Sequence, residues 1–489
     1  MRTKIPISLL VLMLVVTTSS TAFAGAKVKI VNGDGPNEGF NDPTPVPPAP
    51  GNNGKTLGKQ RQIAFQFAAN IWGATLPDIG DYQIRVFAQF NALTCSPAGV
   101  VLGSAGPITV WSDFPGATFS STWYHASLAN KLAGFDLLPG PKIDPVPSFS
   151  SFVENNEIIA QFNSGLGVNP ACAPSFWYYG LDTNTPPNGI NLVAVLLHEF
   201  GHGLGFSNFV NEATGVELGD DPMTPAEDGL DDIYSKFTRD NTTGKTWDTM
   251  TNAERQASAV NTSNVVLIGS NVTNAVNNGA LTGNPTLTVN SPGGIAGSYL
   301  IGPAGFGSAF PAVGLTGNVE LVNDGVGVVT NGCEPLPPAG GPGRIALIDR
   351  GLCTFVTKVL NAQNAGYAGV LIADNVAGSP PAGLGGCNGA ITIPSGRITL
   401  ADGNTIKANL GTGVNVTMGT DPSDIAGADG AGNAQVYAPS VVALGSSISH
   451  YDTAAYPNQL MEPFINCNLT HSVQVPQDLT FELLKDLGW

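Results

Sequence analysis

Basic residues are scarce in this sequence. It contains 20 Lys and Arg against 37 Asp and Glu, and its formal net charge is −17. Nucleic acids and anionic lipid surfaces carry negative charge, so a chain with this balance is repelled by both. The composition therefore excludes a nucleic-acid partner, and the acidic excess favours solubility.

Long apolar runs are absent after the N-terminus. The apolar stretch Ile7–Val16 follows the basic Arg2 and Lys4 and precedes Ala22-Phe23-Ala24. This order is typical of a secretory signal peptide that is cleaved after Ala24, and the apolar stretch is too short to cross a bilayer. The sequence therefore predicts a signal at residues 1–24, a secreted protein and no membrane span.

Cysteine is also scarce, and no two cysteines form a C-x-x-C pair, which argues against a thiolate zinc site. The six cysteines are Cys95, Cys172, Cys333, Cys353, Cys387 and Cys467. An even number in an exported protein indicates disulfides. We expect Cys333 to pair with Cys353, because the two flank one candidate strand, and Cys95 to pair with Cys172.

Of only five histidines, two fall in the motif His198-Glu199-Phe200-Gly201-His202. The motif ends an apolar run, Leu192–Leu197, that is long enough for a buried helix. Residues four apart lie on one face of a helix, so both imidazoles can bind one metal ion. Glu199 projects beside that metal, where a general base for a metal-activated water belongs. The motif predicts a zinc-dependent hydrolase.

Glycine and proline are abundant, with 61 and 37 residues, which indicates many turns and loops. Residues 25–58 are predicted to be a Pro- and Gly-rich arm rather than a folded element. A helical pattern begins near Lys59, and alternating patterns at residues 82–90 and 157–163 predict strands. With the motif helix, these elements predict a mixed sheet with packed helices, an α+β domain whose first part covers residues 59–281.

From about Thr282 short strands alternate with turns. A strand within residues 343–355, a helix at 357–366 and a buried strand at 368–375 predict a small α/β unit. From Gly343 to about Asn375, and recognisably to about Leu400, this segment resembles the protease-associated (PA) domain. The resemblance implies a non-catalytic module, inserted at residues 282–422, that limits or docks protein substrates.

A catalytic zinc usually has three protein ligands, and the motif supplies two. Gly205 matches the glycine of the metzincin pattern H-E-x-x-H-x-x-G-x-x-H, but Asn208 stands where that pattern has its third histidine. An amide oxygen is a poor zinc ligand. Residues 211–219 are too rich in Gly and β-branched residues to favour a second helix that supplies a glutamate. The candidates for the third ligand are Glu212, Glu217, Asp220, Asp221, His125, His450 and His471.

The segment Gly445–Asp452, followed by Asn458–Pro463, resembles the end of the leishmanolysin group of metzincins. The resemblance implies that His450 is the third zinc ligand, delivered from beyond the inserted module, and that Met461 forms a turn under the zinc. A methionine suits that position because its soft side chain fills a gap without competing for the metal. Asp452 could hold His450 by a hydrogen bond, and His471 remains the main alternative ligand.

These observations predict an α+β, metzincin-like zinc protease domain, with a mixed sheet and an active-site helix, over residues 59–281 and 423–489. The inserted PA-like domain divides it, and a closing helix begins at a cap on Asp478. One zinc ion is expected, and acidic turns could hold structural calcium at Asp220, Asp221, Asp228, Asp231 and Asp232.

The leading functional interpretation is a secreted zinc endopeptidase that acts on protein or peptide substrates, with Glu199 as the general base. Two alternatives stay open. One is an inactive protease-fold protein that serves binding or adhesion, which the complete set of ligands and base argues against. The other is a PA-containing zinc aminopeptidase, which in its two-metal form needs a cluster of bridging carboxylates near the histidines.

Overall fold

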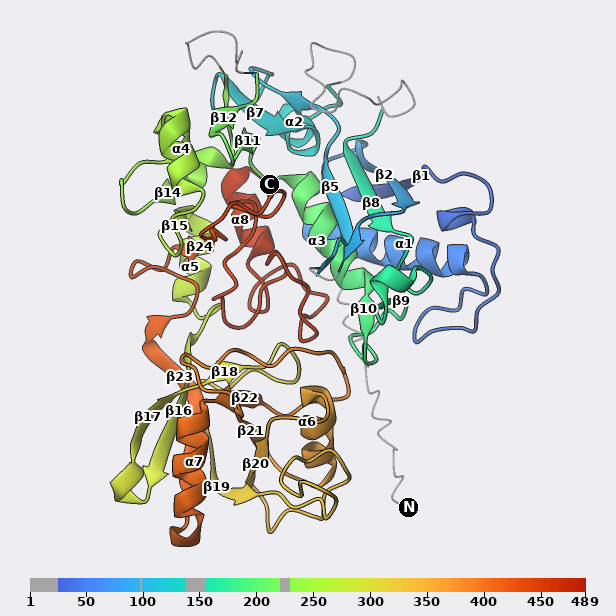
Figure 1. Cartoon of the computed structure of the whole chain (residues 1–489). Helices are drawn as coiled ribbons and strands as arrows, with labels where there is room; N and C mark the ends of the chain where they lie inside the picture. Colours follow the sequence, from blue (N-terminus) through green and yellow to red (C-terminus); the bar gives the residue numbers. More distant parts are fainter. Residues whose placement is uncertain (1–24, 97–98, 138–154, 220–228) are drawn as a thin grey trace, which may run out of the picture.

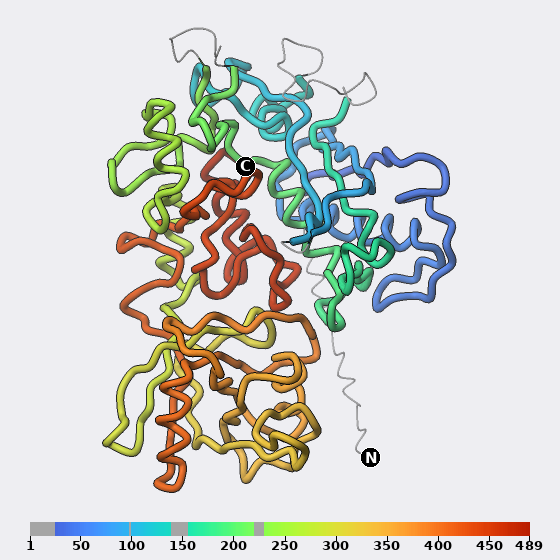
Figure 2. The backbone as a smooth tube through the Cα atoms, viewed as in Figure 1, coloured from blue at the N-terminus to red at the C-terminus, as the bar shows by residue number. Residues whose placement is uncertain are grey.

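The described part of the chain folds into two units with separate cores (Figures 1 and 2). A computed structural model describes residues 25–96, 99–137, 155–219 and 229–489. Buried side chains of the first core come from residues 26–281 and again from residues 434–489. Those of the second unit come mainly from the residues between these two stretches. The second unit is thus inserted into the first, and the expected signal at residues 1–24 lies outside the described residues.

A four-stranded sheet supports the first unit. Its order is β1-β2-β8-β5, and the strands are β1 (Lys27–Asn32), β2 (Gln83–Asn91), β8 (Ile158–Asn163) and β5 (Gly103–Pro107). The first three strands are parallel, and β5 runs antiparallel to β8 at the edge. Alternate side chains of β2 are buried, as the sequence pattern predicted. Helices α1 (Leu57–Thr75) and α3 (Leu192–Leu204) contribute to the same core as these strands.

Residues 25–58 differ from the unfolded arm that their composition predicted. Lys27–Asn32 forms an edge strand, and the Phe40 ring packs edge-on against the Phe65 ring with centroids 4.6 Å apart. Arg61 Nη1 donates a hydrogen bond to the Gly39 carbonyl at 2.8 Å. Proline content limits regular structure, but it does not prevent strand pairing before the prolines or the burial of one aromatic ring.

The end of the chain, red in Figure 1, returns to the first unit and packs beside α3. Helix α8 (Thr480–Leu487) begins after Leu479 rather than at Asp478. The Asp478 carboxylate instead joins two segments, since it accepts the backbone N–H of Leu460 at 2.7 Å and that of Thr480 at 2.8 Å. Trp489 Nε1 donates to the Leu204 carbonyl at 2.7 Å and so satisfies an end carbonyl of α3.

The second unit is built on an eight-stranded sheet of order β17-β16-β23-β19-β20-β21-β22-β18. Its strands are β16 (Gly283–Ser291), β17 (Gly297–Leu300), β18 (Gly302–Pro303), β19 (Leu315–Leu321), β20 (Ile345–Asp349), β21 (Gly369–Ala373), β22 (Ser395–Ile398) and β23 (Asn415–Ile425). Helix α6 (Phe355–Asn364) joins the parallel strands β20 and β21, which confirms the predicted strand–helix–strand unit. Because alternate residues of β20 belong to different cores, α6 and α7 (Leu400–Asn409) cover opposite faces of the sheet.

The structure contains three disulfides. Cys95–Cys172 and Cys333–Cys353 are the two pairings that the sequence led us to expect. The third disulfide pairs the two remaining cysteines, Cys387 and Cys467, and it joins the second unit to the C-terminal segment of the first. The two units are therefore linked covalently at their boundary as well as by the chain itself.

The remaining elements are short. The helices are α2 (Ala126–Ala133), α4 (Asn252–Ser258) and α5 (Ser270–Asn277), and the strands are β3 (Cys95–Ser96), β4 (Gly99–Val100), β6 (Val110–Trp111), β7 (Thr122–His125), β9 (Phe176–Tyr178), β10 (Gly189–Asn191), β11 (Val210–Asn211), β12 (Val216–Glu217), β13 (Asp231–Asp232), β14 (Thr238–Asp240), β15 (Val265–Leu267) and β24 (Ala434–Gln435). Across the described ranges, none of the helices combines the length and the hydropathy that crossing a bilayer requires.

Candidate metal centre

Helix α3 carries the H-E-x-x-H motif through the centre of the first unit. Asn191 caps its first turn, since the amide Oδ1 accepts the backbone N–H of Val193 at 3.0 Å and of Ala194 at 3.3 Å. All residues of the helix are buried. It ends at Gly205, whose φ of 142° lets the chain turn away, as expected from the sequence.

Three imidazoles from distant parts of the chain meet beside this helix. The Nε2 atom of His198 lies 3.1 Å from Nε2 of His202 and 3.2 Å from Nε2 of His450. His450 comes from the segment that follows the inserted unit. Among the described residues, these three form the only group of at least three His, Cys, Asp or Glu side chains arranged to hold a metal ion.

Backbone carbonyls orient all three rings. The Nδ1 atoms of His198, His202 and His450 lie 2.7, 2.7 and 2.8 Å from carbonyl oxygens, which belong to Leu460, Phe206 and Ser446. A carbonyl only accepts hydrogen bonds, so each Nδ1 carries the proton and each Nε2 keeps a lone pair. Lone pairs that face one another at these distances repel unless a cation lies among them.

The donor set suits zinc. Three nitrogens bound tetrahedrally at about 2.0–2.1 Å from zinc would lie about 3.3–3.4 Å apart, close to the separations of the Nε2 atoms here. Neutral imidazoles are common zinc ligands, and hydrogen bonds from Nδ1 to carbonyls fix the tautomer that binds through Nε2. The side chains of this cluster therefore fit one zinc ion.

Asp452 does not hold His450, contrary to the sequence-based expectation. Its Oδ1 accepts the backbone N–H of Ala454 at 2.8 Å, while the His450 ring is held by the Ser446 carbonyl. The reason is local geometry: Nδ1 of His450 points back to its own preceding loop, and Asp452 turns forward into the next one.

Glu199 lines the same cavity as the three histidines, a space of about 850 Å³. A Cβ atom added at Gly103 would lie 2.9 Å from Glu199 Oε1, so the glycine in strand β5 leaves room for the carboxyl group. Burial raises the pKa of Glu199 to about 8, and a hydrogen bond from the Ala105 backbone opposes that shift. A cation at the histidines would favour the ionised carboxylate that a general base requires.

Met461 packs beneath the metal motif. It is fully buried, and a Cβ atom added at Gly201 would lie only 2.8 Å from its sulfur. Gly201 lies between the two histidines of α3, so the absence of a side chain there permits this close approach. The preceding Leu460 accepts from His198 through its carbonyl and donates to Asp478 through its N–H. The turn that contains Leu460 and Met461 thus contacts both helix α3 and the ring of His198.

The two remaining histidines have other partners. His125 Nε2 lies 2.8 Å from the Ser207 hydroxyl, and burial lowers the pKa of His125 to about 3. His471 Nε2 lies 3.3 Å from Asn191 Oδ1, and its ring packs against Phe67. Neither joins the triad, so the structure does not bring the main alternative ligand, His471, to the candidate metal centre.

Of the other candidates for the third ligand, Glu212 and Glu217 are described, and both have protein partners outside the triad. The Asn208 amide oxygen accepts the Val210 N–H at 2.8 Å, and Asn208 Nδ2 donates to Glu212 at 3.3 Å. Glu217 forms an ion pair with the buried Arg255 at 2.8 Å. Strands β11 and β12 form a hairpin here. As the Gly-rich sequence suggested, this segment is not the second helix that would present a glutamate.

The acidic turns expected to hold calcium are only partly described. Asp220, Asp221 and Asp228 lie outside the described residues. Asp231 pairs with Lys236 at 3.0 Å, and Asp232 accepts backbone N–H groups of Phe209 and Ser235. Protein groups therefore contact both described carboxylates, and calcium binding stays a prediction.

We expect the two motif histidines to destabilise the metal-free protein as the pH falls from about 7 to about 5. Burial lowers the pKa of His198 to about 4 and that of His202 to about 3, where the neighbouring imidazole adds to the effect. These two histidines bind protons over this range in the unfolded chain but not in the folded chain, so their contribution to folding stability rises with pH. The raised pKa of Glu199 acts in the opposite direction, and the comparison with a variant isolates the histidines. Thermal unfolding of chelator-treated protein at several pH values measures this. A His198→Gln, His202→Gln double variant should show a shallower dependence, and an unchanged slope would contradict the assignment.

Comparison with known proteins clarifies the inserted unit. Residues 317–406, which include most of strand β19 and all of β20 to β22, match the PA domain family. The chain therefore contains a PA domain. This confirms the module that the sequence of residues 343–375 resembled, while the match covers too little of the chain to assign the rest of it.

Curated relatives share a limited stretch with this chain. A probable leucine aminopeptidase 2 of Aspergillus fumigatus is 34% identical over 160 residues, which cover 28% of this chain and 31% of that protein. Vacuolar-sorting receptor 1 of Pisum sativum is 30% identical over 149 residues, which cover 28% of this chain and 23% of the receptor. This chain thus spans less than a third of either relative. Proteins with such different names match parts of this chain, so these matches do not by themselves decide an activity.

Similarity to solved structures is weaker. BSAP, a zinc aminopeptidase from Bacillus subtilis, is 20% identical, with a TM-score of 0.21 over 30% of this chain and 35% of that one. So low a TM-score is no basis for a common overall fold. The leucine aminopeptidases among the curated relatives correspond by name to the aminopeptidase alternative expected from the sequence better than to the endopeptidase.

Proposed function

We propose that this protein is a secreted, zinc-dependent endopeptidase with a metzincin-like catalytic domain. The observation that carries the proposal is the convergence of the Nε2 atoms of His198, His202 and His450 beside Glu199 in one cavity. Three disulfides support export, because such bonds persist in oxidising compartments.

In this proposal the three histidines hold the metal and Glu199 moves the proton. Zinc bound there would supply Lewis acidity towards a peptide carbonyl and would lower the pKa of water. Glu199 accepts a proton from the attacking water at its carboxylate and donates it to the nitrogen of the leaving amine. Met461 supports the α3 turn that carries both motif histidines, and Leu460 orients His198.

The walls of the cavity suit an extended peptide. Residues 99–105, which include the start of strand β5, line the cavity. In the part of the chain that the structure describes, strand β5 is the last strand of its sheet and pairs with β8 alone, so its other edge can pair with a substrate backbone. A substrate held in this way extends in both directions from the metal, which favours cleavage within a chain over removal of a terminal residue.

A second candidate is an aminopeptidase, and the names of relatives such as the leucine aminopeptidase of Aspergillus fumigatus favour it. A two-metal enzyme of that kind needs carboxylates that bridge its ions. In the ranges 25–96, 99–137, 155–219 and 229–489, no further metal-binding group of three or more His, Cys, Asp or Glu side chains accompanies the triad. We therefore place the single-metal endopeptidase first.

The full secreted chain should cleave an internally quenched peptide that is blocked at both ends, and a chelator should stop the reaction until zinc is restored. An endopeptidase accepts blocked ends because it recognises an interior segment. Mass spectrometry of the products identifies internal cleavage. If the enzyme instead releases only single residues from a free amino terminus, as from leucine anilide, the aminopeptidase assignment replaces this one.

A further inference from the structure

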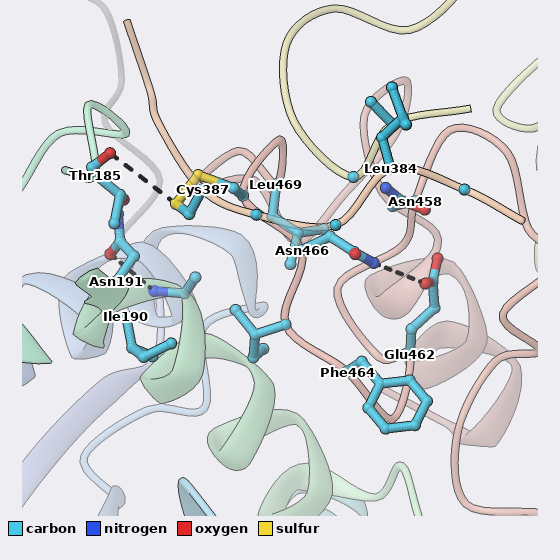
Figure 3. A pocket seen from close by; sticks show the side chains of 18 of the residues that line it. Thr185, Ile190, Asn191, Leu384, Cys387, Asn458, Glu462, Phe464, Asn466 and Leu469 are labelled. Carbon is cyan, nitrogen blue, oxygen red and sulfur yellow. Dashed lines mark hydrogen bonds between the residues drawn. A yellow bond between two sulfur atoms is a disulfide. The ribbon is translucent and has the colours of Figure 1, made fainter. Parts of the chain in front are cut away.

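A second cavity, of about 580 Å³, lies between the two units (Figure 3). The first unit contributes residues near the start of α3, the PA domain contributes residues 383–387, and the C-terminal segment contributes residues 458–469. Residues common to this cavity and to the cavity of the metal centre are Ser175, Ile190, Glu462, Phe464 and Ile465. The two cavities are therefore neighbours that share part of their walls.

The wall that the PA domain contributes is fixed in place. The Cys387–Cys467 disulfide joins it to the C-terminal segment, and both cysteines line the cavity. The backbone N–H of Cys467 donates to the Gly305 carbonyl at 2.9 Å, and that of Gly389 donates to the Thr185 carbonyl at 2.8 Å. Bonds thus connect the PA domain to the first unit on two sides of the cavity, so its shape depends on both units.

Among the described residues that line this cavity, Glu462 is the only one with an ionisable side chain. Its Oε1 accepts the Gln459 N–H at 2.6 Å, and its Oε2 accepts from Asn466 Nδ2 at 3.1 Å, a bond drawn in Figure 3. A carboxylate oxygen has two acceptor positions, so each oxygen retains one. Within the described residues, no Lys, Arg or His forms an ion pair with Glu462.

The carboxyl groups of Asp452 and Asp478 lie near Glu462 and would, like Glu462 itself, attract a cation in the cavity. Burial raises the pKa of the Glu462 carboxyl group, and the two nearby carboxylates add to that shift. A positive charge in the cavity would favour the ionised form. The other side chains offer apolar surface, from Ile190, Leu384, Phe464 and Leu469, and amide groups, from Asn191, Asn458 and Asn466. A long side chain with an apolar stem and a charged end matches this lining.

We propose that this cavity is a distal substrate subsite that takes a lysine or arginine side chain, with Glu462 as the residue that determines this specificity. The proposal rests on the proposed peptidase function and adds a substrate class to it. The PA domain then acts as one wall of the subsite, and the acidic net charge of the protein attracts basic substrates from a distance.

Paired peptides that differ in one charge test the subsite. Lysine is placed in turn at each position around the cleavage site and compared with norleucine, which keeps the stem and lacks the ammonium group. The wild-type protein should prefer lysine about 10- to 100-fold in kcat/KM at one position away from the scissile bond. Glu462→Gln should remove that preference and leave the norleucine peptide almost unaffected. Glu334→Gln, the same change at an exposed position of the PA domain, is the control.

Two results would overturn the subsite. One is a wild-type protein without a preference for lysine at any position, and the other is a Glu462→Gln variant that loses activity equally on both peptides, since the carboxylate would then serve only the turn. Binding of the same peptides to the Glu199→Gln protein gives a readout without turnover. A lysine preference in binding without cleavage by the wild type would retain the subsite and reject the peptidase. Cleavage by the wild type without a preference for lysine would retain the peptidase and reject the subsite.

Gly385, which belongs to the PA domain, allows an independent test of the subsite. It lines the cavity, and a Cβ atom added there would have no other atom within 4 Å. Gly385→Lys should place a competing ammonium group in the cavity and reduce kcat/KM for the lysine peptide at least about 10-fold more than for the norleucine peptide. Gly385→Ala is the matched control and should leave the preference intact. Equal effects of Gly385→Lys on both peptides would contradict a charge-selective subsite.

Discussion

Replacing Glu199 with glutamine should reduce peptide cleavage by about 10³-fold while the protein keeps its zinc. Glutamine has almost the same shape, so it fits the space that Gly103 leaves and still accepts a hydrogen bond from the Ala105 backbone. Its amide cannot take up a proton at neutral pH, so proton transfer from water to the leaving amine is lost. Cleavage of a blocked peptide and the zinc content of the purified protein measure the two properties together.

The zinc content distinguishes a variant that has lost only the general base from one that has lost the metal centre. Burial already raises the pKa of Glu199, so a neutral amide there introduces no new buried charge and should leave the thermal stability close to that of the wild type. Glu334→Gln controls for the loss of one negative charge at the surface. Retained cleavage at full zinc occupancy would remove Glu199 from the mechanism.

The motif helix was predictable because its signal is local. An apolar run, a histidine pair at helical spacing and a glycine at the end specify a buried helix, and α3 spans Leu192–Leu204 with Gly205 as its exit. Asn191, the cap of that helix, was missed, although an Asn immediately before an apolar run is a recognised start signal. The strand–helix–strand unit of the PA domain was predictable for the same reason, since its periodicity lies within about thirty residues.

Features that depend on tertiary contacts were not predictable in this way. The Leu460 carbonyl orients the His198 ring from a distant part of the chain. The carbonyls of Phe206 and Ser446 are only four residues from His202 and His450, but a backbone carbonyl leaves no mark in the sequence. Asp452 looked suitable because it is close to His450 along the chain, but ring orientation decides which acceptor a nitrogen meets. The interdomain cavity combines residues near positions 190, 385 and 465, and only the fold brings them together.

The composition of residues 25–58 predicted an arm without a folded element, and this prediction was wrong. The prolines between Pro43 and Pro50 suggested an arm, yet Lys27–Asn32 pairs with β2 and Phe40 enters the core. The gain from burying one phenylalanine, roughly 1.5–3 kcal/mol, helps to order a chain segment that has little regular structure of its own. A composition averaged over many residues does not show that one aromatic ring, that of Phe40, is buried in the core.

Replacing His450 with alanine should lower zinc affinity more than about 100-fold and abolish peptide cleavage. Loss of a neighbouring hydrogen-bond partner alone typically costs about 10- to 100-fold in metal affinity, so loss of a ligand should cost more. The His450 ring faces His198 with Nε2 atoms 3.2 Å apart, and its Nδ1 is held by Ser446. Competition with a chelating indicator measures the affinity.

His471→Ala is the decisive comparison, because His471 is the other downstream histidine that could have completed the site. Its ring packs on Phe67, and its Nε2 contacts Asn191 at the start of α3. The substitution should therefore lower the melting temperature somewhat while zinc affinity stays near that of the wild type. Both variants remove one imidazole, so a difference between them in zinc affinity reflects the position of the histidine in the fold and not the type of residue that is lost. If His471→Ala loses zinc and His450→Ala keeps it, the third ligand is His471, and His450 is only a buried ring beside the motif.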